Sequence, residues 1–241
     1  MIIVRRTFCR QRAKDRSAYS YELASHATPL RRKTTTYDER MQRGKETNVR
    51  LVAGLLDGIV IEPFGCFSFH GLVGRPKKKR GFVLGPEMQR GKLEEGLGGG
   101  TCSVSNLLYW IAINAGMKIT ERHRHGLDLF PDHGRTVPFA CGATVFYNQA
   151  DLRFENPLDI PVLLALTVDE ENLVGRLLTT KDPGLRFEVY ETDHSFEKRN
   201  GQTFRENRIR RRIFLPDGHT LLDEEIAHNK AVVLYDRDGD D

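Results

Sequence analysis

The sequence has little cysteine and no long apolar run. Its 241 residues include four cysteines, and no two of them form a C-x-x-C pair. So few scattered cysteines argue against a disulfide framework, and we expect reduced thiols. The N-terminal apolar stretch, Ile2 to Val4, is far shorter than the core of a signal peptide, and no later stretch is long enough to span a bilayer. The sequence therefore predicts a cytoplasmic protein without a transmembrane segment, with association with the cell envelope as the alternative.

Positive charge is in slight excess and is concentrated in two runs. The formal net charge is +4, and the runs are Lys77–Arg80 and Arg208–Arg212. Such runs are typical of nucleic-acid-binding segments. The first, however, lies between Pro76 and Gly81 as a solvated loop would, and the second alternates with apolar residues as a half-exposed strand does. We therefore expect no nucleic-acid partner. A solvated charged surface is the simpler interpretation, and contact with an anionic envelope polymer or membrane surface is an alternative.

Helical patterns come early in the chain and strand patterns come late. Val104 to Met117 carries apolar residues at the helical period and reaches a stop signal at Gly116, which predicts a central buried helix. A short amphipathic helix is expected after Thr47, a typical N-cap residue, ending at Gly58. Apolar segments bounded by turn residues predict strands at 59–61, within 63–69, and at 80–84, 152–154, 161–168, 173–179, 187–190, 209–215 and 231–235. The expected fold is α+β, with one central buried helix packed against a β-rich sheet or sandwich.

Composition divides the chain into three parts. Residues 1–42 are arginine-rich and weakly periodic, and we interpret them as a basic N-terminal arm that is partly ordered. Residues 43–235 form the folded domain, with a motif-bearing core at 47–156 and a β-rich part at 157–235. Residues 236–241 are an acidic tail.

The stretch with the most chemical content runs from Gly98 through Gly99, Gly100 and Cys102 to Ser103. It places a thiol at the start of the predicted central helix, where unpaired amides and the positive dipole end favour a thiolate. Cys102 is therefore a candidate nucleophile, with the amide of Ser103 or of the glycine turn as donor to an oxyanion. The glycines also permit a second backbone to approach closely. The simpler alternative is that Cys102 is a small buried hydrophobic residue beneath a tight turn.

A second group of polar residues follows the central helix. Glu121, His123 and His125 fall on one face if this segment is a strand, because strand side chains alternate. A strand that leaves the end of the helix can fold back beside it and bring a histidine to the thiol. We expect His125 to act as the base, with Glu121 and His123 as binding residues. Asp151 is the predicted carboxylate nearest to the site, and Glu121 is its rival.

Several motifs follow one another in an order that resembles the VanW family, named for vancomycin-resistance gene clusters. They lie at Pro63–Phe69, Arg80–Phe82, Gly98–Cys102, Glu121–His125, Gly142–Val145 and Asp151–Asn156. The resemblance runs from about Thr47 to Asn156, and the segments Phe130–Arg135 and Phe146–Asn148 look most like the resistance-cluster branch. It implies an accessory role in glycopeptide resistance or cell-wall metabolism, without an established molecular activity.

The chain departs from the family pattern at three places. Ser103 stands where a glutamine usually follows the cysteine, and Cys141-Gly142 stand where many relatives have Arg-Asp. Gly126 replaces a serine after the second histidine. The first two departures remove an amide that could have supported an oxyanion and a carboxylate that could have oriented a histidine.

Three functions are compatible with these motifs. The first is a cysteine-dependent hydrolase or acyltransferase acting on a cell-wall peptide, with Cys102, His125 and Asp151 as its catalytic residues. The second is a non-catalytic module that binds a peptidoglycan stem peptide or precursor through the glycine turn and the residues Ser103, Glu121 and His123. The third is a zinc site drawn from Cys102, His123 and His125 with His133 or Cys141, which the weak His-x-His spacing makes the least favoured. We expect no metal and no cofactor.

Overall fold

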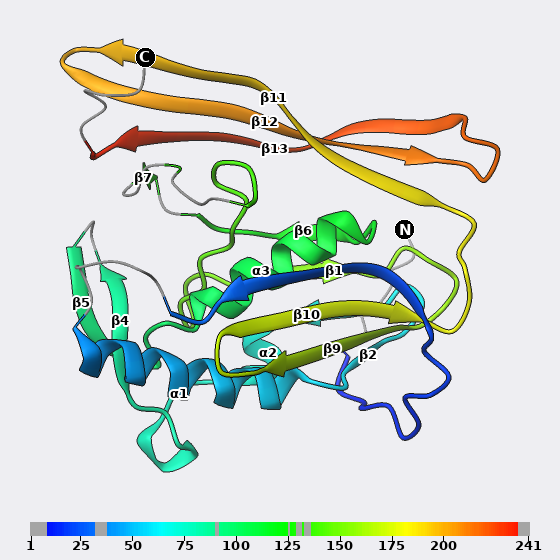
Figure 1. Cartoon of the computed structure of the whole chain (residues 1–241), viewed down its shortest axis with the longest axis horizontal. Coiled ribbons are helices and arrows are strands. Elements are labelled where there is room, and N and C mark those ends of the chain that lie inside the picture. Colours follow the sequence, from blue (N-terminus) through cyan, green and yellow to red (C-terminus); the bar gives the residue numbers. More distant parts are fainter. Residues whose placement is uncertain are drawn as a thin grey trace, which may run out of the picture. The chain divides into compact units, whose positions relative to one another are not determined.

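The computed structural model describes residues 9–31, 38–89, 92–124, 126–128, 132 and 136–235. The chain divides into two compact units (Figure 1), the first of residues 1–123 and 142–183 and the second of residues 124–141 and 184–241. Helices and several sheets are both present, so the predicted α+β class is confirmed. None of the described helices is long and apolar enough to cross a membrane.

The first unit is built on a four-stranded antiparallel sheet of order β1-β10-β9-β2. Its strands are β1 (Tyr21–Pro29), β10 (Asn172–Thr179), β9 (Val162–Val168) and β2 (Val60–Ile61). β9 is almost entirely apolar, as expected of a strand that is buried on both faces. β1 lies within the range that we assigned to the N-terminal arm, where its mixed polar sequence gave no strand signal.

Helix α1 (Glu39–Leu56) packs against β9 and begins well before the expected start. The predicted N-cap at Thr47 is wrong, because the Thr47 hydroxyl donates to the Arg43 carbonyl within the helix at 2.9 Å. The true N-cap is Asp38, whose carboxylate accepts a hydrogen bond from the Met41 amide at 2.7 Å. The first turns of α1 are largely polar, so the apolar period begins only halfway along the helix.

Helix α3 (Cys102–Asn114) is the predicted central helix, and its prediction is confirmed. Val104, Leu108 and Ile111 are fully buried, and the helix packs against β1 and β10. Gly175 of β10 permits this approach, since a Cβ there would lie 3.0 Å from the Leu107 side chain. The core of the first unit therefore surrounds the helix that carries Cys102.

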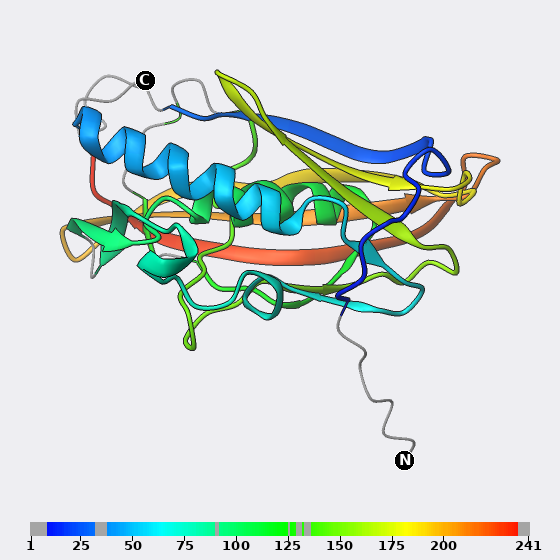
Figure 2. The same ribbon diagram turned by 90° about the horizontal axis from the view of Figure 1, so that it is seen from below.

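Two smaller sheets and two short helices complete the first unit. Strands β3 (Cys66–Ser68), β8 (Arg153–Glu155) and β6 (Lys118–Glu121) form an antiparallel sheet of order β3-β8-β6. Strands β4 (Leu84–Gln89) and β5 (Lys92–Leu97) pair antiparallel, and α1 runs beside them (Figure 2). Helix α2 (Phe69–Val73) follows β3, and the 3₁₀ helix η1 (Lys78–Arg80) precedes β4.

The strand expected at 80–84 is wrong. Arg80 ends η1, and Gly81 has φ +90°, a left-handed conformation that interrupts an extended run. The strand therefore begins only at Leu84, and it continues through a polar stretch without a strand pattern.

The second unit is a sheet of three long antiparallel strands, with a short fourth strand parallel to the last of them. The strands are β11 (Arg186–Arg199), β12 (Gln202–Phe214), β13 (Thr220–Val233) and β7 (Leu127–Asp128). The first three have 14, 13 and 14 residues, whereas the apolar patterns at 187–190, 209–215 and 231–235 predicted much shorter strands. Much of their extra length consists of charged residues that pair across the strands.

Arg205 is the buried centre of the second unit. Its side chain is 2% exposed and binds Asp128 at 3.1 Å and also Asp132. The guanidinium carbon lies 4.3 Å from the centre of the Phe139 ring and 5.0 Å from that of Phe196. Burial opposes the charge on Arg205, but the two carboxylates outweigh it, and the pKa of Arg205 is raised.

Candidate functional site

The glycines ahead of Cys102 are packing residues. A Cβ on Gly99 would lie 2.1 Å from the carbonyl oxygen of Gly85 in β4, and a Cβ on Gly85 would lie 2.6 Å from that of Gly99. The buried amide of Asn48 in α1 donates to the Gly99 carbonyl at 2.9 Å and to the Val83 carbonyl at 3.0 Å. A Cβ on Gly100 would meet Lys45 of the same helix at 2.9 Å or less. The second backbone that the glycines admit is thus the protein's own.

Cys102 is the first residue of α3, where the sequence predicted a thiolate. Its Sγ lies 3.7 Å from the Val145 carbonyl oxygen. Burial raises the pKa of the Cys102 thiol, and the nearby Glu87 carboxylate acts in the same direction. Burial therefore opposes the thiolate that the start of the helix was expected to favour, and the role of Cys102 as a nucleophile stays a prediction. The amide of Ser103, a predicted oxyanion donor, already donates to the Gly100 carbonyl at 3.0 Å.

The segment 142–145 connects the thiol to the polar residues after the helix. Asn106 of α3 accepts a hydrogen bond from the Ala143 amide at 2.8 Å. The Thr144 amide donates to the His123 carbonyl at 2.8 Å, and the carbonyl oxygen of the following residue, Val145, faces the Cys102 sulfur. The main chain of His123 and the side chain of Cys102 therefore contact neighbouring residues of one segment.

Asp151 lies two residues before the start of β8 and accepts four hydrogen bonds. Its Oδ1 accepts from the amides of His70 and Leu152, both at 2.9 Å. Its Oδ2 accepts from the Ser68 hydroxyl at 2.6 Å and from Arg153 Nε at 2.9 Å. Burial opposes ionisation, but these donors outweigh it, and the pKa of Asp151 is lowered. A carboxylate offers about four acceptor positions, so a histidine would have to displace one of these donors.

Glu121 and His123 lie beside Asp151. Glu121 Oε1 accepts from the Asp151 amide at 3.1 Å and lies 3.0 Å from His123 Nε2, and its Oε2 lies 3.3 Å from Arg153 Nε. The side chains of His123 and Arg153 are 45% and 43% exposed. We call Glu121, His123, Asp151 and Arg153 the charged cluster. The structure thus brings together three of the predicted site residues.

Three residues of this site were not predicted from the sequence: Arg153, which belongs to the charged cluster, and Ser68 and His70, which lie beside it. Ser68 is the N-cap of α2 and orients Asp151, and the His70 ring meets the Tyr147 ring edge to face with centres 5.5 Å apart. Burial lowers the pKa of His70, although the Asp151 carboxylate and the Ala150 carbonyl act in the opposite direction. The alternation Asp151-x-Arg153 was the available sequence signal for the arginine, but Ser68 and His70 are distant in sequence.

The predicted base and part of the zinc hypothesis fall outside the described residues. His125 and His133 both lie outside the described ranges, so the pairing of His125 with Cys102 stays a prediction. Within the described ranges, no group of three or more His, Cys, Asp or Glu side chains is arranged to hold a metal ion.

The family model described as "VanW like protein" matches residues 44–178, more than half of the chain. The chain belongs to the VanW family. The matched region of this VanW-family chain includes the glycine turn, Cys102 and the whole charged cluster. The predicted family is confirmed.

Two relatives of this VanW-family chain stand out. It is 27% identical over 202 residues to the vancomycin B-type resistance protein VanW of Enterococcus faecalis (strain ATCC 700802 / V583), covering 83% of this chain and 74% of that protein. It is 32% identical over 147 residues to the uncharacterized protein YoaR of Bacillus subtilis (strain 168), covering 59% of this chain and 46% of YoaR. The alignment thus spans about half the length of YoaR. No solved structure is significantly similar to the chain.

Proposed function

We propose that this VanW-family chain is an accessory protein of glycopeptide resistance or cell-wall metabolism that binds a peptidoglycan stem peptide or its precursor without forming a covalent bond. The name of the Enterococcus faecalis relative connects the family with vancomycin resistance. The matched region carries the charged cluster, which supplies the chemistry for binding.

The observation that carries the proposal is the charged cluster. The half-exposed side chains of Arg153 and His123 lie beside the carboxylates of Glu121 and Asp151. A stem peptide carries free carboxylates and an amino group, so a surface that presents both signs of charge is complementary to it. Strand pairing between β6 and β8 and the four hydrogen bonds of Asp151 hold the cluster in place. A preorganised cluster loses little conformational freedom on binding.

The state of Cys102 favours binding over bond formation. A cysteine nucleophile reacts as the thiolate, and burial raises the pKa of the Cys102 thiol. The Ser103 amide is already engaged by Gly100, so it is not preorganised for an oxyanion.

A cysteine-dependent hydrolase or acyltransferase is the second candidate. It is favoured by the position of Cys102 at the start of α3 and by the segment 142–145, which contacts both Cys102 and His123. In this mechanism the Cys102 sulfur attacks the carbonyl carbon of a peptide bond while His125 accepts the thiol proton. The C–N bond then breaks and His125 returns the proton to the leaving amine, after which water or an acceptor amine releases the acyl group from the sulfur.

Calorimetric titration of the full chain with a synthetic stem pentapeptide tests the proposal. We expect saturable binding that Arg153→Gln weakens on the order of 10-fold, as is usual for loss of a hydrogen bond to a charged group. Arg176→Gln is the matched control, because Arg176 is an exposed arginine of the same unit that pairs with Glu22 and lies outside the charged cluster.

Mass spectrometry of the same mixtures separates the two candidates. The binding proposal predicts an unchanged peptide and unchanged affinity in Cys102→Ala. A cleaved or transferred peptide, or an acyl adduct on the protein, that disappears in Cys102→Ala would instead establish the enzyme. Absence of binding to the stem peptide in the wild type would overturn the binding proposal.

A further inference from the structure

The two basic runs of the sequence have different surroundings in the structure. In β12, Arg208 pairs with Glu225 at 2.6 Å and Arg211 pairs with Glu224 at 2.6 Å. Arg212 lies 3.3 Å from Glu188. The charge of this run is therefore largely neutralised by its neighbouring strands.

The first run, Lys77–Arg80, is not neutralised in this way. Among the described residues, no carboxylate lies within 4.0 Å of the cations of Lys77, Lys78, Lys79 or Arg80. All four residues are exposed, and three of them form η1. Arg80 donates to the Arg75 carbonyl at 3.0 Å, which folds the run into a compact turn. The turn thus presents a concentrated positive charge to solvent.

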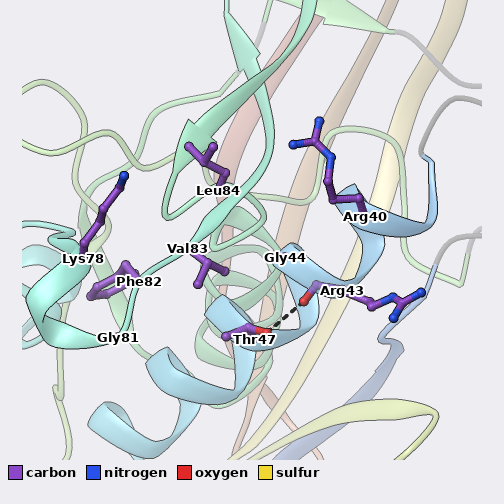
Figure 3. Close-up of a pocket in the computed structure, with 9 residues that line it drawn as sticks. All are labelled: Arg40, Arg43, Gly44, Thr47, Lys78, Gly81, Phe82, Val83 and Leu84. Atoms are coloured by element: carbon purple, nitrogen blue, oxygen red, sulfur yellow. Dashed lines mark hydrogen bonds between the residues drawn. The ribbon is translucent and has the colours of Figure 1, made fainter.

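The basic run borders an open groove of about 580 Å³ between α1 and β4. Lys78 lies on one side of Val83 and Leu84, and Arg40 and Arg43 lie on the other (Figure 3). Arg40 and Arg43 each contact one carboxylate but remain 69% and 73% exposed. The groove therefore combines cations on both sides with an apolar strip along its floor.

The apolar strip is unusual because it is exposed. Val83 and Leu84 are 38% and 46% exposed, whereas the adjacent Phe82 is buried. Exposed aliphatic side chains beside lysines that have no carboxylate neighbour in the described ranges suit the headgroup region of an anionic bilayer, where phosphates lie next to acyl chains. Single-stranded nucleic acid would instead require exposed aromatic rings for stacking, and the ring at this place is covered.

We propose that Lys77–Arg80 together with Val83 and Leu84, the basic–apolar face, docks on an anionic phospholipid surface. The lysines bind lipid phosphates, and the two aliphatic side chains enter the space between headgroups. This inference is independent of the stem-peptide proposal, because it uses neither the charged cluster nor Cys102.

Co-sedimentation of the full chain with vesicles tests the proposal. We expect binding to vesicles that contain phosphatidylglycerol and none to vesicles of phosphatidylcholine alone. Replacing Lys77, Lys78 and Lys79 with alanine should weaken binding on the order of 100-fold, since each lysine near an anionic surface contributes about a 5-fold factor. Leu84→Ser should cause a further loss that persists when salt screens the charges.

The matched control is the triple change Lys14→Ala, Lys181→Ala and Lys198→Ala, which removes the same charge from three other exposed lysines. Its binding should equal that of the wild type. The proposal is overturned if the control loses as much affinity as the test variant, or if the wild type ignores anionic vesicles. It is also overturned if inorganic phosphate displaces the vesicles, or if single-stranded DNA binds more tightly than they do.

Discussion

Replacing Asp151 with asparagine should destabilise the first unit strongly. Asp151→Asn preserves the shape of the side chain but removes its charge and turns an amide NH₂ toward two of its four donors. Hydrogen bonds to a charged group contribute about 1.5–3 kcal/mol each, and the contact with the half-exposed Arg153 adds little. We expect a loss of about 3 kcal/mol in the free energy of unfolding near neutral pH.

The stability that Asp151 contributes should depend on pH. The pKa of Asp151 is lower in the folded chain than the value of about 3.9 in an unfolded chain. A lowered pKa stabilises the fold above the unfolded value, and this stabilisation is lost as the pH falls through the folded value. The asparagine cannot titrate, so the difference in stability between wild type and variant should shrink as the pH falls below about 4.

Urea unfolding followed by tryptophan fluorescence measures this effect. Trp110 is the single tryptophan of the chain and lies in α3, so its emission reports on the first unit. Asp159→Asn, at an exposed aspartate of the same unit, is the control and should change stability by less than about 0.5 kcal/mol. The reasoning would be refuted if Asp151→Asn behaved like this control, or if its deficit did not change with pH.

Three further outcomes are expected. Gly99→Ala should lower the free energy of unfolding by several kcal/mol, because the new Cβ would lie 2.1 Å from the backbone of Gly85. Gly54→Ala is the control: its Cβ would have no atom within 4 Å, and it should raise the free energy of unfolding by about 0.5–1 kcal/mol. Equal urea midpoints for the two variants would contradict this. Iodoacetamide should modify Cys102 slowly near neutral pH and faster as the pH rises, as measured by mass spectrometry. A raised pKa of Cys102 would be disproved if this thiol were alkylated faster than the thiol of glutathione at the same pH. Arg205→Met should lower the stability of the second unit by about 3–5 kcal/mol, because the buried Asp128 loses the guanidinium that it pairs with. Adding Asp128→Asn to this variant should restore part of the lost stability, and hydrogen exchange in the second unit measures both effects.

The apolar elements of the fold could be predicted from the sequence. α3, β9 and β10 were found because their buried faces impose a helical or strand period. β1 and the long ends of β11 and β13 were not, since cross-strand pairing rather than apolar burial specifies them. The start of α1 was missed because its first turns are polar.

The candidate site was predicted in part. Glu121, His123 and Asp151 were found from their motifs, and the structure places them in contact. Ser68 and His70 reach the site through the pairing of β3 with β8, which no local pattern encodes. The direction of the Cys102 pKa shift could not be predicted, because the helix end is visible in the sequence but the burial around the sulfur is not.

The reciprocal contact of Gly85 and Gly99 fixes the alignment of a sheet that is otherwise weakly specified. In the described part of the chain, β4 and β5 pair with no strand but each other, and two such six-residue strands could slide by one residue with little change in backbone hydrogen bonding. A slip of β4 would bring the Cβ of Leu84 or Pro86 to the place that Gly85 occupies, where less than 3 Å separates a Cβ from the Gly99 carbonyl. The shifted alignments are therefore excluded by steric clash. The two glycines favour a single register of β4 against β5 because they lack side chains.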